Sequence, residues 1–278
     1  MESRHVIWAS DIAGLGKVAT LAALPILAAC QLEVAVLPTV ILSSHTGGFP
    51  HVYRENYQEG MTAFLRQWQE LEVDFSALLV GYLGSEKQLD ILATFATEQE
   101  LPLLLDPIMG DGGRLYKGFD LSYVEKMRQL CPQAQLILPN LTEACFLADF
   151  PYPQGLMTAE DLKALLEKLR DLTAGHILVT GIPLTEHTLS VAYLAAGEEE
   201  LQLFSRPLIP GYFSGAGDIL TALVVAAYLQ GKDLATFLPR ALDFLEAGIR
   251  ATCKRGGNSQ YGIFYQPFLG EILNMFRD

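Results

Sequence analysis

The sequence predicts an α/β fold with a mainly parallel central sheet that is covered by helices on both faces. Strand-length apolar runs alternate with segments of helical period through most of the 278 residues, which is the pattern of strands joined by helical crossovers. Half of the residues are hydrophobic and 18% are charged, so the chain can bury a large core. The length suits one large α/β domain and no Pro-, Gly- or Ser-rich linker interrupts it, so a single domain over residues 1–278 is expected.

Each strand is expected where a short apolar run lies between polar or glycine-rich turns. The predicted strands are His5–Ala9, Glu33–Ile41, Ala77–Val80, Leu103–Leu105, Gln135–Leu138, His176–Thr180, Leu189–Leu194 and Leu201–Ser205. Each helix is expected where apolar residues recur every three or four positions. The predicted helices are Lys17–Ala29, Arg54–Leu71, Glu86–Glu100, Leu121–Leu130, Leu141–Ala148, Ala159–Leu172, Ala216–Leu229 and Leu234–Cys253. In such a sheet, ligands bind beyond the carboxyl ends of the strands, so the loops there are where functional residues are expected.

Composition excludes several kinds of partner. The formal net charge is −13, so we expect no general attraction to nucleic acid or to anionic lipid, and any anionic substrate must be held by local groups. The longest apolar stretch, Val18 to Cys30, contains Pro25 and is shorter than the roughly 20 residues of a membrane span. No secretory signal is visible at the first residues, and the four cysteines form no C-x-x-C pair. These features predict a cytoplasmic protein with reduced thiols.

The segment from Gly14 to Ala19 fits G-x-G-x-x-A at the opening of a helix, which is the dinucleotide-binding pattern. That pattern also needs an acidic residue at the end of the second strand. Glu33 lies at the beginning of that strand and not at its end, and residues 34–53 contain no acidic residue. An NAD-binding oxidoreductase is therefore a weak alternative, and the glycines equally suit close packing of a helix on the sheet. No complete P-loop is present.

The strongest local pattern is Gly215-Ala216-Gly217-Asp218 ahead of an apolar helix. Glycines let the backbone approach a ligand, and the free amides at a helix N-terminus point at any anion placed there. Asp218 in the first turn can act as the general base for a phosphoryl acceptor, or it can merely stabilise the helix terminus. The residue types alone do not separate these two roles.

Two loops after later strands carry further polar side chains. Asp106 and Asp111 lie in D-P-I-M-G-D-G-G after the strand at Leu103–Leu105, where paired carboxylates suit Mg²⁺. A plain surface turn is the alternative. Asn140 and Glu143 precede a helix with the spacing of a capping box, which we prefer to a supporting role at a metal.

The polar loop S-S-H-T-G-G after the second strand includes His45, which can donate or accept a proton near pH 7. A lone histidine in a glycine loop is more often structural. Tyr82, in G-Y-L-G after another strand, suits either a planar ligand or core packing.

Taken together, these motifs occur in the order typical of one enzyme family. They are Ser10 after the first strand, T-V-I-L-S-S-H-T-G from Thr39, Gly81-Tyr82, D-P-I-M-G-D from Asp106, P-N-L-T-E from Pro139 and G-A-G-D from Gly215. With them, the chain resembles the vitamin B6 kinase branch of the ribokinase-like family over nearly its whole length. The H-T-G loop and G-x-G-D are specific in combination. The resemblance implies a three-layer α/β/α sandwich.

The resemblance also implies an activity, which is ATP-dependent phosphorylation of the 5′-hydroxymethyl group of pyridoxal, pyridoxine or pyridoxamine in vitamin B6 salvage. It implies a cytoplasmic homodimer that uses Mg²⁺, with a monovalent cation as an optional addition. Asp218 would be the base, with Gly215, Ala216 and Gly217 as the anion hole for the γ-phosphate. The pyridine pocket would be lined by Ser10, Val40, Thr46 and Tyr82, with His45 close to it. Mg²⁺ and the ATP phosphates would be served by Asp106, Asp111, Asn140 and Glu143, with Asp106, Asp111 and Glu143 as metal residues and with Tyr116 and Thr180 near the nucleotide.

Three positions depart from the family's usual pattern. Leu138, Gly181 and Ala216 stand where hydroxyl side chains are usual, and a lost hydrogen bond to a charged group is typically worth about 1.5–3 kcal/mol. ATP handling is therefore expected to differ. The alternatives kept are a kinase for hydroxymethylpyrimidine or another small alcohol, and a B6-binding protein without turnover.

Overall fold

The computed structural model describes residues 5–256 and 258–277, and it divides the chain into two compact units. The first unit comprises residues 1–78 and 209–278, and the second comprises residues 79–208. We describe each unit by itself.

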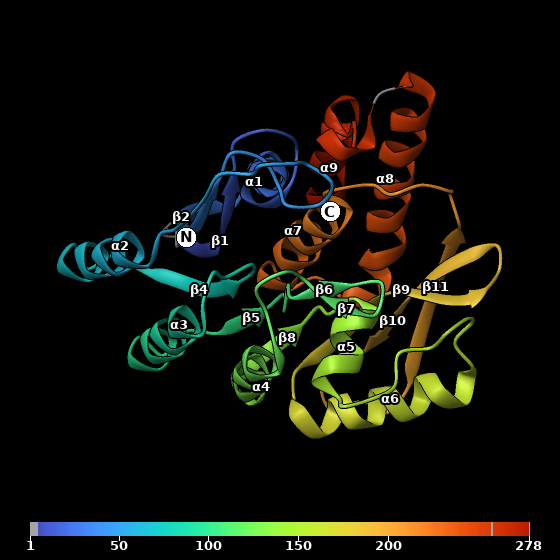
Figure 1. The fold of residues 1–278 in the computed structure, drawn as a ribbon, viewed down its shortest axis with the longest axis horizontal. Coiled ribbons are helices and arrows are strands. Elements are labelled where there is room, and N and C mark those ends of the chain that lie inside the picture. The colour runs from blue at the N-terminus through green and yellow to red at the C-terminus, as the bar shows by residue number, and fades with distance from the viewer. Residues whose placement is uncertain (1–4, 257, 278) are drawn as a thin grey trace. The chain divides into compact units, whose positions relative to one another are not determined.

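The first unit contains four strands and five of the α-helices among the described residues. Its strands are β1 (His5–Ala13), β2 (Glu33–Leu42), β3 (Arg54–Asn56) and the start of β4 (Phe75–Val80). Its helices are α1 (Ala19–Ala29), α2 (Gln58–Glu70), α7 (Ala216–Leu229), α8 (Leu234–Arg255) and α9 (Leu269–Phe276). The strand order is β4-β1-β2-β3, with β1 and β2 parallel and β3 antiparallel at the edge. Helix α1 packs on β1, β2, α7 and α9, whereas α2 packs on β2 (Figure 1).

The second unit holds the rest of the sheet. Its strands are the end of β4, β5 (Leu103–Leu105), β8 (Ala134–Ile137), β9 (His176–Thr185), β10 (Thr188–Leu194) and β11 (Leu201–Pro207), with a separate hairpin of β6 (Gly110–Asp111) and β7 (Arg114–Leu115). Its helices are α3 (Glu86–Glu98), α4 (Leu121–Leu130), α5 (Leu141–Leu147) and α6 (Ala159–Leu172). The strand order is β11-β10-β9-β8-β5-β4, parallel from β5 to β9 and antiparallel from β9 to β11. Helices α3, α4, α5 and α6 pack in succession, as Figure 1 shows.

The predicted α/β class with a mainly parallel sheet is confirmed, and each predicted strand and helix exists. The prediction of a helix from Arg54 was wrong at its start, because Arg54–Asn56 pairs with β2 as an edge strand. The Asn56 side chain then accepts from the amide of Gln58, where α2 begins. Helix α9 and the short strands β3, β6 and β7 were not predicted. Within the described ranges, no helix is both long and apolar enough to cross a membrane.

An irregularity in the pairing of β1 with β2 lies where the predicted site begins. Ser10 pairs with Pro38 and Ile12 pairs with Ile41, so β2 carries one extra residue opposite Asp11. Such bulges re-aim side chains and are frequent next to functional sites. Ser10 and Asp11 are both buried at this point.

Candidate active site

Helix α7 begins at a glycine whose conformation and surroundings exclude other residues. Gly215 is the N-cap residue and has a φ of 84°, a left-handed conformation that side chains rarely adopt. A Cβ atom there would lie 2.3 Å from the carbonyl oxygen of Lys17. The G-A-G-D opening is therefore packed backbone to backbone against the segment that leads into α1.

The carboxylate of Asp218 is held by another helix. Its Oδ2 accepts a hydrogen bond of 2.7 Å from the amide of Ala19, the first residue of α1, and this is its one side-chain hydrogen bond among the described residues. Burial raises the pKa of Asp218, and the hydrogen bond from the Ala19 amide partly opposes that rise. Asp218 is thus not a cap of its own helix, and one of its oxygens is left for another partner.

A second acidic residue, Asp11, lies close enough to Asp218 to feel its charge. Burial and then the charge of Asp218 raise the pKa of Asp11 to about 7, while its own backbone and Ser10 act in the opposite direction. The Ser10 hydroxyl donates to Asp11 Oδ1 at 3.3 Å. Near neutral pH, Asp11 is therefore partly protonated and adds less than a full negative charge beside Asp218. Sequence reasoning missed Asp11, although an acidic residue at the end of a buried apolar strand was a visible signal.

The loop that carries His45 is tied to the C-terminal segment. His45 Nδ1 accepts from the amide of Gly47 at 3.1 Å, which places the proton on Nε2, and Nε2 then donates to the carbonyl oxygen of Gln260 at 2.6 Å. The tautomer is assigned from these bonds. Both ring nitrogens are therefore used inside the protein. The structure gives His45 a role in holding the shape of this loop against the C-terminal segment.

In the second unit, Glu143 is the centre of a buried hydrogen-bond network. Its Oε2 accepts from the amide of Asn140 at 2.8 Å, and its Oε1 accepts from the amides of Met109 and Gly110. Asn140 Oδ1 accepts in return from the amide of Glu143, so the capping box at the start of α5 is confirmed. Burial and then the charge of Asp106 raise the pKa of Glu143 well above its ordinary range.

The same network joins the two predicted polar loops of this unit. Asn140 Nδ2 donates to the carbonyl oxygen of Gly110 at 2.9 Å, and the Thr142 hydroxyl accepts from the amide of Gly113. Thr180 pairs with Asn140 in an isolated bridge. Asp106 is buried, whereas Asp111 is exposed and its Oδ1 accepts from the next amide in its own turn. The structure thus brings four of the predicted residues into one cluster, namely Asp106, Asn140, Glu143 and Thr180.

The remaining predicted residues occupy several environments. Val40 is buried in β2, Thr46 is exposed, and Tyr116 is partly exposed with its amide bonded to Met109. Tyr82 is largely buried, with its ring 5.5 Å from that of Phe119.

The positions that depart from the usual motifs have structural reasons of their own. Leu138 is buried in the core, and Gly181 has a φ of 73°, which favours glycine. Next to the G-A-G-D opening, the Ser214 hydroxyl is buried and has no hydrogen-bond partner among the described residues.

Known proteins of similar structure define the fold class of this chain. Solved structures that match nearly the whole chain include kinases of the ribokinase-like fold. Pyridoxal kinase from Lactobacillus plantarum matches with 31% identity and a TM-score of 0.90 over 99% of this chain and 98% of its own. A Bacteroides thetaiotaomicron protein, provisionally named a phosphomethylpyrimidine kinase and crystallised with pyridoxal, matches with 32% identity and a TM-score of 0.89 over 98% of this chain and 96% of its own.

The family model described as phosphomethylpyrimidine kinase matches residues 38–262, and the chain belongs to this family. Among curated proteins, one from Schizosaccharomyces pombe with the provisional name pyridoxal kinase is 27% identical over 216 residues, which is 72% of this chain. The chain spans 61% of the length of that relative.

Proposed function

We propose that this protein transfers the γ-phosphoryl group of ATP to the 5′-hydroxymethyl group of a B6 vitamer. The observation that carries the proposal is Asp218, a partly buried carboxylate in the first turn of α7, with one of its oxygens bonded to Ala19 and the other without a partner among residues 5–256 and 258–277. The similar pyridoxal kinase and the similar protein crystallised with pyridoxal support the same acceptor.

The chain's own groups support each part of such a transfer. Asp218 would take the proton of the hydroxymethyl group as its oxygen attacks the γ-phosphorus, the new O–P bond forms, and the bond to ADP breaks. The first turn of α7, from Gly215 to Gly217, would meet the charge of the phosphoryl group with amides and the positive end of the helix. Because Gly215 is fixed against Lys17, these donors are pre-positioned and no net positive protein charge is needed.

A divalent cation fits the acidic cluster of the second unit. Asp106 and Glu143 are close, buried and of like charge, and a cation nearby would lower the pKa of Glu143 again. Mg²⁺ usually keeps waters and substrate phosphates among its ligands, so it needs few carboxylates from the protein. Asp106 would hold Mg²⁺, Glu143 would fix the loop beside it, and the metal would neutralise phosphate charge. Asp111, Tyr116, Asn140 and Thr180 are proposed to serve the nucleotide.

The pyridine pocket is proposed to include Ser10, Val40, Thr46 and Tyr82, with His45 shaping it. The proposal further includes a cytoplasmic location, a homodimer and no nucleic-acid partner.

Incubation of the purified protein with Mg-ATP and each vitamer tests the function. We expect a phosphorylated product and equal amounts of ADP for at least one vitamer. If no vitamer is phosphorylated while ATP and Mg²⁺ are present, the proposal is wrong.

A second candidate is phosphorylation of a hydroxymethylpyrimidine, because the family model carries that description. The reaction uses the same base and anion hole on another aromatic alcohol. Adding the pyrimidine to the same substrate panel separates the two candidates through their kcat/KM values.

A further inference from the structure

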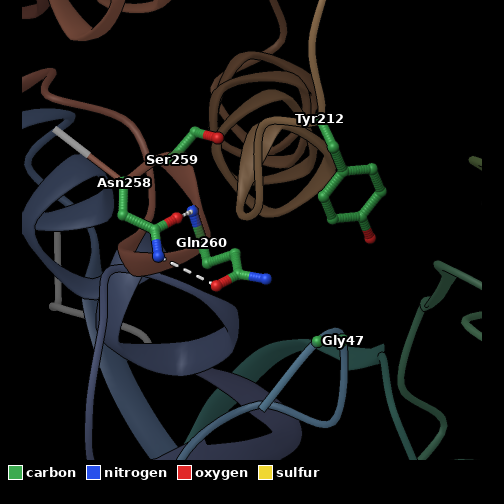
Figure 2. Close-up of a pocket in the computed structure, with 6 residues that line it drawn as sticks. Gly47, Tyr212, Asn258, Ser259 and Gln260 are labelled. Atoms are coloured by element: carbon green, nitrogen blue, oxygen red, sulfur yellow. Dashed lines mark hydrogen bonds between the residues drawn. The ribbon is translucent and has the colours of Figure 1, made fainter. Parts of the chain in front are cut away.

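An open cavity of about 700 Å³ lies in the first unit. It is lined by Gly47 and Gly48 of the His45 loop, by Tyr212, and by Asn258, Ser259 and Gln260 (Figure 2). All six lining residues are uncharged, so the cavity is suited to a neutral, hydrogen-bonding part of a ligand and not to its phosphates.

The Gln260 amide is oriented by its neighbours. Asn258 Nδ2 donates to Gln260 Oε1 at 2.9 Å, and Asn258 Oδ1 accepts from the backbone amide of Gln260. The amide nitrogen, Nε2, is therefore turned away from Asn258, into the space between Tyr212 and Gly47 (Figure 2). Nε2 has no hydrogen-bond acceptor among the described residues. The cavity thus presents a pre-oriented N–H donor.

The C-terminal segment of the cavity and the helix that carries the proposed base border the same backbone segment at Lys17. His45 Nδ1 accepts from the amide of Gly47, and His45 Nε2 donates to the carbonyl oxygen of Gln260. Gly48 also approaches Gln260 so closely that a Cβ atom would lie 2.3 Å from Nε2. The Lys17 carbonyl oxygen lies against Gly215 at the start of α7 and also against Gly262, two residues after Gln260. The segment that carries Gln260 therefore lies beside the helix opening where the reacting arm of an acceptor would bind.

We infer that Gln260 determines which B6 vitamer is preferred, by donating a hydrogen bond to the substituent at ring carbon 4. This inference rests on the proposed function. Carbon 4 is the substituted neighbour of the carbon that bears the reacting arm, and it carries an aldehyde, a hydroxymethyl or an aminomethyl group. The first two offer an oxygen acceptor, whereas a protonated aminomethyl group, like a lysine ammonium, only donates. Gln260 therefore favours pyridoxal and pyridoxine over pyridoxamine.

The test measures kcat/KM for pyridoxine and pyridoxamine in the unchanged protein and in Gln260→Glu. A glutamate keeps the oxygen that accepts from Asn258 and replaces the donor with an acceptor for the ammonium group. We expect the ratio of the two kcat/KM values to move toward pyridoxamine by about tenfold or more, the scale of one hydrogen bond to a charged group. The matched control, Gln266→Glu at an exposed position of the same unit, should leave the ratio unchanged.

The possible results separate the inference from the function. An unchanged ratio in Gln260→Glu, with active protein, would overturn the inference and leave the proposed kinase intact. If the unchanged protein phosphorylates no vitamer, the function is wrong, and calorimetric binding of pyridoxine and pyridoxamine to both proteins then tests the cavity directly. If Gln260→Glu does not fold, Gln260→Leu removes the donor, and a preference for pyridoxine that persists in it contradicts the inference.

Discussion

Asp218 in the first unit and Glu143 in the second are both carboxylates at the start of a helix, but they differ in how many of their oxygens accept hydrogen bonds. Asp218 and Glu143 both lie in the first turn of a helix, and burial raises the pKa of both. Glu143 accepts from three backbone amides with its two oxygens, whereas Asp218 accepts from one amide with a single oxygen. A carboxylate with every oxygen used holds the backbone in place, and one with an oxygen to spare can exchange a proton with a ligand.

The largest effect should come from Asp218→Asn. Removing a general base typically lowers the rate by about 10² to 10⁴, and the amide oxygen can still accept from Ala19, so stability should change little. Steady-state phosphorylation of the best vitamer measures kcat, and chemical denaturation measures the free energy of unfolding. The control is Asp233→Asn, because Asp233 caps α8 through the amides of Ala235 and Thr236. It should cost up to about 1 kcal/mol of stability and no rate. Near-normal turnover in Asp218→Asn would make Asp218 a structural residue like Glu143.

The pH dependence of stability tests the electrostatic surroundings of Asp218 through its neighbour Asp11. Its pKa rises from the ordinary 3.8 to about 7, so the folded state keeps a proton that the unfolded chain releases. Stability is therefore lost as the pH rises between these values, by up to about 4 kcal/mol. Asp11→Asn cannot lose a proton there. Its free energy of unfolding should match that of the unchanged protein near pH 4 and exceed it increasingly up to pH 8.

Unfolding by urea at several pH values measures this difference, in which the titration of the other groups largely cancels. A difference that stays constant from pH 4 to pH 8 would show that Asp11 ionises normally, and the charge next to Asp218 would then be larger than described above.

Glu143→Ala tests whether the carboxylate of Glu143 stabilises the second unit through its hydrogen bonds to backbone amides. The substitution leaves the amides of Met109, Gly110 and Asn140 without their acceptor, and unsatisfied buried donors cost about 1–3 kcal/mol each when water cannot replace the partner. We expect a loss of about 2–4 kcal/mol in the free energy of unfolding. Glu167→Ala, at an exposed helical position whose salt bridge to Lys163 is long, should change it by less than about 0.5 kcal/mol. A stability loss no larger than that of Glu167→Ala would contradict the network.

Local patterns predicted most of the fold, because long apolar strands and amphipathic helices are fixed by nearby residues. The capping box at Asn140 and Glu143 is local in the same sense and was predicted. By contrast, edge strand β3 depends on pairing with β2, and its three exposed polar residues carry no apolar pattern of their own.

The sequence predicted which residue types form the candidate site, but it did not predict which residues contact one another there. G-A-G-D indicated Asp218, yet its partner Ala19 lies 199 residues away, and no spacing rule connects the two. The bond of His45 to Gln260 spans 215 residues, which explains why the cavity at Gln260 was not foreseen. Asp11 was missed for a related reason, since its shifted pKa arises from burial and from a charge that is distant in sequence.

The smallest effect is expected from a substitution of Gly215, the residue that sets the position of helix α7 and of Asp218 on it. Gly215→Ala places a Cβ against the carbonyl of Lys17 at a positive φ, so α7 must shift or the backbone must stay strained, at about 1–3 kcal/mol. Gly231 also has a positive φ, of 67°, but a Cβ there would meet nothing within 4 Å. Gly231→Ala therefore measures the conformational cost alone, about 1 kcal/mol. Thermal unfolding of both variants measures their stability, and steady-state phosphorylation measures their kcat. If the close contact positions the donors, only Gly215→Ala should lower kcat, and equal kcat values would separate the packing of α7 from the chemistry of Asp218.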